Sequence, residues 1–343
     1  MMAMFELRSL RVPVVQAPMA GGPSTPELAG AVSNAGGLGF LAAGYRSAEA
    51  LAEQIHHTRL ITGQPFGVNL FVPQPSVAAP AALAAYAAEL APDARRLGVE
   101  PGTPHPDDDD WAAKLDVLFE LRPAVASFTF GTPDAETVAR LGDADVLVLV
   151  TVTSLAEAKA ALAAGAPALV VQGPLAGGHR GTFDPAAPPP ADDLETLFGR
   201  IRHHTDAPLV AAGGLTTPAA VARALAHGAV AVQAGTAFLL ATEAGTSAVQ
   251  RQALVAPGFT ETIVTHAFSG RPARALVNDF VRRHDATAPL GYPEVNQLTG
   301  PLRAAAGAAG DPDGTNVWAG AAWRDIRSGT AAEIVRHLAK EIE

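Results

Sequence analysis

The stretch TTPAAVARALAHGAVAVQAG, residues 216–235, reads as one helix followed by one strand. Thr217 is a typical helix N-cap and Pro218 suits the first helical position, so a helix is expected to begin there. Gly228 is expected to end that helix, and the apolar run after it predicts a buried strand over residues 230–234. The stretch therefore predicts half of a β-α-β unit.

The same pattern occurs twice more along the chain. Residues 24–42 start a helix with Thr25, and residues 153–173 start one with Ser154 and with Glu157 in a capping box. Apolar runs at similar spacing predict eight strands, at about 13–17, 37–41, 66–70, 125–130, 146–151, 168–172, 208–212 and 230–234. Because most of these runs are continuously apolar, both faces of the sheet are expected to be covered.

Eight such units predict an α/β fold, the (β/α)8 TIM barrel, and a doubly wound open sheet is the alternative. The long gaps between strands, 70–125 and 172–208, are expected to carry insertions. Residues 262–316 break the pattern and predict a small helical lid near the C-terminus. We therefore expect a barrel over 1–261, a lid or substrate-side insert over 262–316, and a C-terminal helical segment over 317–343 that packs on the barrel.

Composition excludes several classes of function. The chain has 343 residues and no cysteine, so disulfides, thiolate metal sites and a thiol nucleophile are impossible. Its net charge is −10 and its basic doublets at 95–96 and 282–283 are isolated, so nucleic-acid binding is not expected. Residues 224–242 are uncharged, but their glycines and polar side chains favour a buried helix end and strand over a membrane span. The acidic run 107–110 is expected to be a solvated loop. These features predict a cytoplasmic protein without membrane contact, either a monomer or a homodimer.

The active site of such a barrel lies where strands end and loops begin. The residues expected there are Pro18, Met19, Asn69, Gln172, Gly177, Gly178, His179, Gly213, Gly214, Gln233, Ala234, Gly235 and Thr236. They include no carboxylate pair and no lysine, so glycosidase and Schiff-base chemistry are not expected. The histidines of the chain have no metal-ligand spacing, so no metal is expected.

Amides and glycines at strand ends suit a flat, phosphorylated cofactor. Glycines after the last two strands let backbone N–H groups approach a phosphate, helped by the dipole of the following helix. The side-chain amides of Asn69 and Gln172 suit the polar edge of a flavin. A site without a metal or a thiol needs a cofactor for redox chemistry, and FMN fits these amides and glycines. Glycines that only permit tight turns are the alternative interpretation.

A family resemblance is carried by four segments: QAPMAGGPSTPELAGAVSNAGGLGFL, GVNLF, VVQGPLAGGHRG and LVAAGGLTTPAAVARALAHGAVAVQAGTAFLLATEAG. In this order they resemble the nitronate monooxygenases, once called 2-nitropropane dioxygenases, and more narrowly their class I branch. The resemblance covers residues 10 to 245, approximately. It implies an FMN-containing barrel that oxidises alkyl nitronates with O2 to a carbonyl compound and nitrite. Propionate 3-nitronate is the implied substrate.

The resemblance also implies roles for individual residues. Flavin contacts fall on Asn69, Gln172, Gly177, Gly214 and the stretch Gln233 to Thr236, while Pro18 and Met19 lie near the reactive ring. The catalytic histidine falls on His179, in a loop with four glycines.

Two roles are open to this imidazole. A protonated His179 attracts an anionic nitronate, whereas a neutral one takes a proton from a neutral nitroalkane. We expect the first, because a nitronate is already deprotonated. Arg180 is expected to be a structural ion-pair partner, and Tyr292 and Asn296 in the lid receive no role.

Two other functions stay open at this point. One is an FMN-dependent NAD(P)H:quinone or enoyl reductase on the same barrel. The other is a barrel that binds a phosphorylated ligand without redox chemistry.

Overall fold

Eight parallel strands dominate the computed structural model, which describes residues 4–187 and 192–342. They are β1 (Val14–Gln16), β2 (Gly39–Ala42), β3 (Phe66–Phe71), β4 (Val125–Thr129), β5 (Leu147–Val152), β6 (Ala168–Gln172), β8 (Leu209–Ala212) and β9 (Ala231–Ala234). Every strand predicted from the sequence is present, close to its expected bounds.

The sheet closes into a barrel where β1 meets β2. The strand order is β1-β9-β8-β6-β5-β4-β3-β2, and a parallel bridge between Val15 and Leu38 joins its two ends. The N–H of Leu38 donates to the carbonyl of Val14 at 3.0 Å, and the N–H of Gln16 donates to the carbonyl of Leu38 at 2.9 Å. Because the end strands are hydrogen-bonded to each other, the open-sheet alternative is wrong and the (β/α)8 barrel is confirmed.

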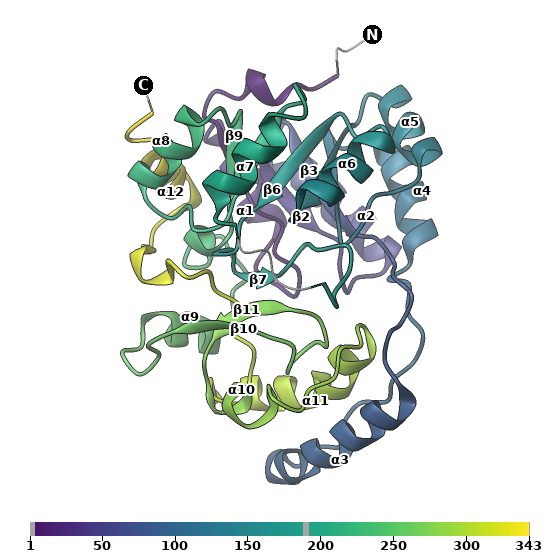
Figure 1. Cartoon of the computed structure of the whole chain (residues 1–343). Helices are drawn as coiled ribbons and strands as arrows, with labels where there is room; N and C mark the ends of the chain where they lie inside the picture. The colour runs from purple at the N-terminus through teal and green to yellow at the C-terminus, as the bar shows by residue number, and fades with distance from the viewer. Residues whose placement is uncertain (1–3, 188–191, 343) are drawn as a thin grey trace.

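Helices surround the barrel (Figure 1). They are α1 (Pro26–Asn34), α2 (Ala48–Ile61), α4 (Trp111–Leu121), α5 (Ala135–Asp143), α6 (Leu155–Ala163), α7 (Leu194–Arg202), α8 (Pro218–Ala226) and α12 (Ala331–Leu338), with short 3-10 turns η1 (Leu7–Ser9), η2 (Thr236–Phe238) and η3 (Trp323–Asp325). The predicted N-caps Thr25, Ser154 and Thr217 each accept the backbone N–H three residues further on. The predicted capping box is wrong, since the Glu157 carboxylate accepts the N–H of Thr153 and not that of Ser154.

Apolar side chains fill both sides of the sheet. Val15, Phe40 and Val210 belong to a cluster that faces the barrel interior, because alternate residues of the same strands pack against the helices. The C-terminal helix α12 buries Ile334 and Leu338 against the barrel. A filled interior leaves the carboxyl edge of the strands as the place for a binding site.

A second layer covers this carboxyl edge (Figure 1). It contains α3 (Pro80–Leu97), α9 (Ala248–Val255), β10 (Thr262–Thr265), β11 (Ala273–Leu276), α10 (Asp279–His284) and α11 (Glu294–Ala308). Its apolar core includes Tyr86, Phe268 and Leu302, so α3 from the 70–125 insertion packs with segments near the C-terminus. The expectation of a purely helical insert did not include β10 and β11, or the contribution of α3.

The short strand β7 (Gly178–His179) joins the two layers. It follows β6 along the chain and pairs antiparallel with β11, placing His179 opposite Ala273 and Gly178 opposite Arg274. The predicted site loop is therefore fixed to the second layer by backbone pairing.

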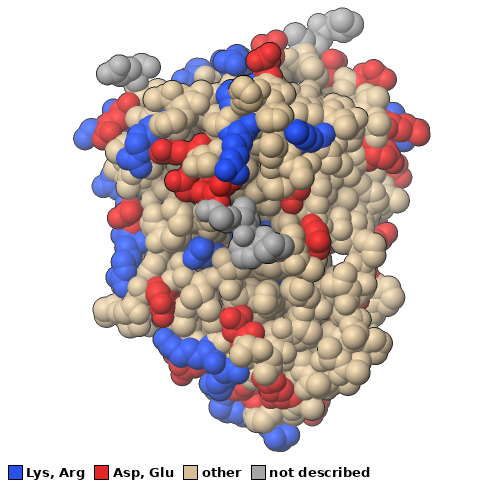
Figure 2. Space-filling view, in the orientation of Figure 1, with Lys and Arg blue, Asp and Glu red and all other residues tan. Residues whose placement is uncertain are grey.

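Acidic side chains outnumber basic ones in the chain, 34 to 24. On the face shown in Figure 2, basic and acidic side chains are interspersed. Within residues 4–187 and 192–342, every helix is too short or too polar to cross a membrane.

Candidate functional site

A cavity of about 800 Å³ lies at the carboxyl edge of the barrel, beneath the second layer. Every residue that the sequence predicts for the site lines it: Pro18, Met19, Asn69, Gln172, Gly177, Gly178, His179, Gly213, Gly214, Gln233, Ala234, Gly235 and Thr236. The strand ends therefore bring these residues to one place.

Glycines form one wall of the cavity because the backbone there leaves no room for side chains. A Cβ on Gly177 would lie 2.4 Å from the backbone N of Gly320. Gly213 and Gly214 have φ values of +106° and +77°, a region that side chains disfavour. This wall presents backbone atoms to the cavity.

The same wall contains a candidate anion site. Over the described part of the chain, the N–H groups of Gly213, Gly214, Gly235 and Thr236 donate to no protein acceptor. They follow the neighbouring strands β8 and β9, and η2 begins at Thr236. Free N–H groups at the start of a helical turn favour a phosphate or another anion.

The two side-chain amides differ in their availability. Asn69 donates to the Ser127 hydroxyl at 2.9 Å and to Thr129 at 3.0 Å, and its carbonyl oxygen has no donor among the described residues. Gln172 donates to the carbonyl of His179 at 3.1 Å and accepts the N–H of Gly181 at 2.9 Å. Gln172 therefore also shapes the histidine loop.

The imidazole of His179 is held on several sides. Its Nε2 lies 2.9 Å from Oγ of Ser269. The rings of Trp318, Phe130 and Tyr292 lie with centroids 5.3, 5.8 and 6.1 Å from the imidazole. The lid residue Tyr292 thus belongs to the wall around His179, a contact that the sequence did not reveal.

Burial and two guanidinium groups, those of Arg271 and Arg303, lower the pKa of His179 to about 3. The imidazole is therefore neutral near pH 7, and the expectation of a protonated histidine is wrong for this cavity. The arginines supply the positive charge instead.

Arg271 lies just behind the cavity and was missed in the sequence. It is 1% exposed, its guanidinium lies 3.8 Å from the centroid of the Phe130 ring, and it donates to the carbonyl of Thr182. Phe130 has a φ of +78°, which is unusual for a bulky residue and indicates a strained position beside the site.

Arg303 of α11 lines the cavity directly. It donates to Asn296 Oδ1 at 2.8 Å, Thr299 Oγ1 at 3.0 Å and Asn316 Oδ1 at 3.1 Å. Asn296, which had no predicted role, therefore orients this arginine. The Arg- and Asn-rich composition of 262–316 indicated a polar insert, but it did not single out Arg271 or Arg303.

Two other expectations need correction. Arg180 donates to the carbonyls of Gly173 at 2.5 Å and Gln172 at 3.5 Å; it has no carboxylate partner among the described residues, so the ion-pair prediction is wrong. Asp109 of the acidic run is not simply solvated, because its Oδ2 lies 2.8 Å from the buried Nζ of Lys114.

Comparisons with known proteins agree along the whole chain. The sequence model of the family described as nitronate monooxygenase matches residues 3–341. A nitronate monooxygenase of Paraburkholderia phytofirmans is 39% identical over 353 residues, covering 99% of this chain and 95% of its own. A probable nitronate monooxygenase of Staphylococcus aureus is 35% identical over 342 residues, covering 98% and 96%.

Solved structures show the same likeness. A nitroalkane oxidase from Streptomyces ansochromogenes superposes with a TM-score of 0.94 at 46% identity, covering 98% of this chain and 97% of its own. The structure of FabK from Thermotoga maritima gives a TM-score of 0.74 at 25% identity, covering 98% and 94%.

Proposed function

Because this chain belongs to the nitronate monooxygenase family, we propose that it oxidises alkyl nitronates with O2 to a carbonyl compound and nitrite, using FMN. Propionate 3-nitronate is the proposed substrate. One observation carries the proposal: a single cavity joins free backbone N–H groups to a neutral imidazole beside two arginines.

The residues present fit FMN. The free N–H groups of Gly213, Gly214, Gly235 and Thr236 would hold its phosphate. The glycine wall has no side chains, so a flat ring can approach its backbone closely. The free carbonyl oxygen of Asn69 would accept a hydrogen bond from the ring. FMN, when bound, supplies the redox chemistry that this set of side chains lacks.

The protein side of the reaction is the binding and orientation of an anion. The Ser269 hydroxyl donates to the carbonyl of Arg271, so Nε2 of the neutral His179 donates to Ser269 Oγ, and Nδ1, the ring nitrogen left for the substrate, is an acceptor. An imidazole whose pKa is about 3 is a weak base, so we do not assign it proton abstraction; the ring borders the nitronate end of the substrate, and the negative charge there is balanced by Arg271. Arg271 favours a negative charge beside it, and the aromatic rings exclude water.

Two measurements on the purified protein test the proposal. We expect a yellow protein that releases FMN on heating, and nitrite release from propionate 3-nitronate under air. A colourless protein that binds phosphate esters would instead support a barrel without redox chemistry.

The reductase alternative can be tested on the same protein. Under anaerobic conditions, NADH is expected to leave the flavin absorbance unchanged while a nitronate bleaches it. Rapid bleaching by NADH would favour a reductase.

A further inference from the structure

Arg303 is the one charged side chain among the described residues that line the cavity. A guanidinium has five N–H donors. Four contacts use them, to Thr299 Oγ1, Asn316 Oδ1 and both the carbonyl and side-chain oxygens of Asn296. One N–H on Nη1 therefore has no protein acceptor within the described chain.

The charge of Arg303 is also uncompensated. All four of its acceptors are neutral, and none of the described carboxylates forms an ion pair with it. The ionisable groups that act on it are Tyr45, Tyr292 and Tyr86, and burial lowers its pKa from the ordinary value. Tyrosines are uncharged at neutral pH, so the site holds a cation without a counter-ion.

Arg303 belongs to a polar lobe of the cavity between α9 and α11. Gln250 donates to the carbonyl of Asn316 at 3.0 Å, which links the start of α9 to the arginine. The hydroxyl of Thr246, just before α9, also lines the cavity and is buried without a hydrogen-bond partner among the described residues.

This lobe is built from other elements than the phosphate-type site. The free N–H groups there follow β8 and β9, whereas Arg303 lies on α11 near Tyr292, whose ring borders His179. The cavity thus offers one anion site for a cofactor and a separate cation beside the imidazole.

We propose that Arg303 binds a carboxylate at the far end of the substrate and makes the enzyme select nitronates with a second negative charge. The inference rests on the proposed function, because the nitronate end is placed at His179. The guanidinium is held in place by its three neighbouring side chains, so little freedom is lost when the carboxylate binds. A charge-assisted hydrogen bond forms with a dianionic substrate and has no counterpart with a simple alkyl nitronate.

Two carboxylic acids test binding without any reaction. Succinate matches propionate 3-nitronate in shape and charge, and butyrate matches propyl-1-nitronate, which lacks the second charge. At equal ionic strength, we expect succinate to bind the wild-type holoenzyme roughly 10- to 100-fold more tightly than butyrate, measured by titration calorimetry. Equal affinities in the wild type would overturn the proposal, whatever the stability of any variant.

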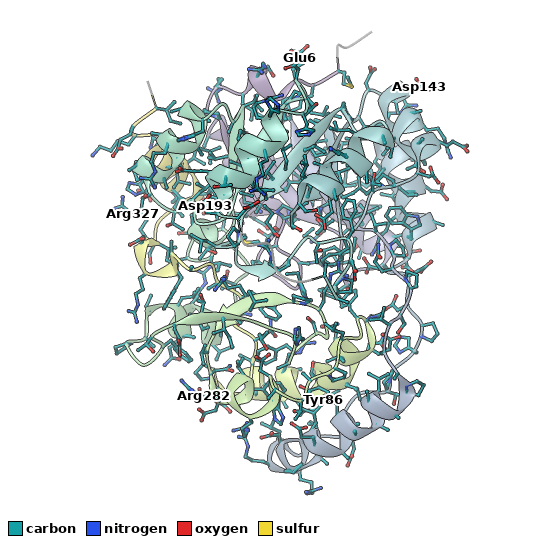
Figure 3. All side chains as sticks on the ribbon, viewed as in Figure 1. Glu6, Tyr86, Asp143, Asp193, Arg282 and Arg327 are labelled. Carbon is teal, nitrogen blue, oxygen red and sulfur yellow. The ribbon has the colours of Figure 1, made fainter. Side chains whose placement is uncertain are left out.

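Variants then assign the preference to the residue. Arg303→Gln is expected to abolish the preference for succinate, and Arg303→Lys is expected to keep part of it. Arg282→Gln is the matched control, because Arg282 lies on α10 in the same layer (Figure 3) and its side chain is 54% exposed. A preference that survives in Arg303→Gln would overturn the assignment.

Kinetics separate this inference from the proposed function. The ratio of kcat/KM for propionate 3-nitronate to that for propyl-1-nitronate is expected to fall roughly 10- to 100-fold in Arg303→Gln, chiefly through KM. A wild-type protein that releases no nitrite from either nitronate contradicts the proposed function, while the succinate titration still decides the role of Arg303. If Arg303→Gln releases nitrite with an unchanged ratio of kcat/KM values, the proposed function is supported and the role of Arg303 in substrate selection is contradicted.

Discussion

The Nε2 atom of His179 lies 2.9 Å from Oγ of Ser269, a contact that joins the loop after β6 to the hairpin between β10 and β11. The same Oγ lies 3.2 Å from the carbonyl oxygen of Arg271 and donates to it. One ring nitrogen of His179 is thereby committed to the protein. Substrate is expected to meet the other.

Replacing His179 by Asn is expected to lower kcat for nitrite release by ~10²–10⁴-fold, the range for a positioned polar group at a reacting centre. The flavin is expected to stay bound, because the proposed phosphate contacts are backbone N–H groups that follow β8 and β9. Steady-state nitrite release and the flavin-to-protein absorbance ratio check both points. His227→Asn, on a 51% exposed side chain, is the control. Unchanged turnover in His179→Asn would show that the imidazole is not catalytic.

Replacing Ser269 by Ala is expected to lower kcat by roughly 10-fold or more, because the imidazole loses the partner that fixes its orientation. A structural role alone would also lower activity, so a double variant is needed. His179→Asn combined with Ser269→Ala is expected to lose no more activity than His179→Asn, since the two residues act as a unit. If the loss of kcat in the double variant equals the product of the two single losses, Ser269 does not act by positioning His179.

The neutral state of His179 has a consequence for stability. Its pKa is lowered from 6.5 to about 3, so below pH 6.5 the unfolded chain binds a proton that the folded protein does not. The free energy of unfolding therefore falls as the pH drops from 6.5 toward 3, by at most about 1.4 kcal/mol per pH unit, and this group has no such effect above pH 6.5. We expect Tm to fall more between pH 7.5 and pH 4.5 in the wild type than in His179→Asn. Equal falls in the two proteins would mean that the imidazole is not held neutral.

The sequence predicts the barrel and most of the cavity wall because both depend on local patterns. Caps such as Thr25 and Thr217 and continuous apolar runs define the units, and parallel strands bring their carboxyl ends to one edge. For this reason the sequence alone groups Asn69, His179 and Gly214 at one site.

The rest depends on contacts between distant segments. Ser269, Arg271 and Arg303 reach the site through the pairing of β7 with β11 and the packing of α3 on α11. No periodicity in the sequence signals those contacts. The predicted charge of His179 was wrong for the same reason, because burial and two arginines from the second layer lower its pKa.

Gly177→Ala is expected to abolish flavin binding or weaken it strongly. The new Cβ would lie 2.4 Å from the backbone N of Gly320 and 2.5 Å from the carbonyl carbon of Ala319, so the glycine wall must shift. Gly199→Ala on α7 is the control, because its Cβ meets nothing within 4 Å and its backbone is helical. Flavin content after gel filtration measures both. A Gly177→Ala protein with full flavin would show that the close approach is not needed for the cofactor.

The buried pair of Asp109 and Lys114 is expected to stabilise the mouth of the cavity. Lys114 is 1% exposed with Nζ 2.8 Å from Asp109 Oδ2, and Oδ1 accepts the N–H of Tyr45, which lines the cavity, at 2.9 Å. Asp109→Asn keeps an acceptor for Tyr45 but leaves the ammonium buried without a counter-charge. We expect it to lower the free energy of unfolding by about 3–5 kcal/mol in urea titrations.

The matched double variant shows whether the charge is the cause. Asp109→Asn with Lys114→Met is expected to be more stable than Asp109→Asn alone, because an apolar side chain removes the uncompensated charge. The exposed pair of Arg282 and Asp279, 2.9 Å apart, gives the comparison: Arg282→Gln is expected to change stability by less than about 1 kcal/mol. If the double variant is the less stable protein, Lys114 contributes through packing of its chain and not through its pairing with Asp109.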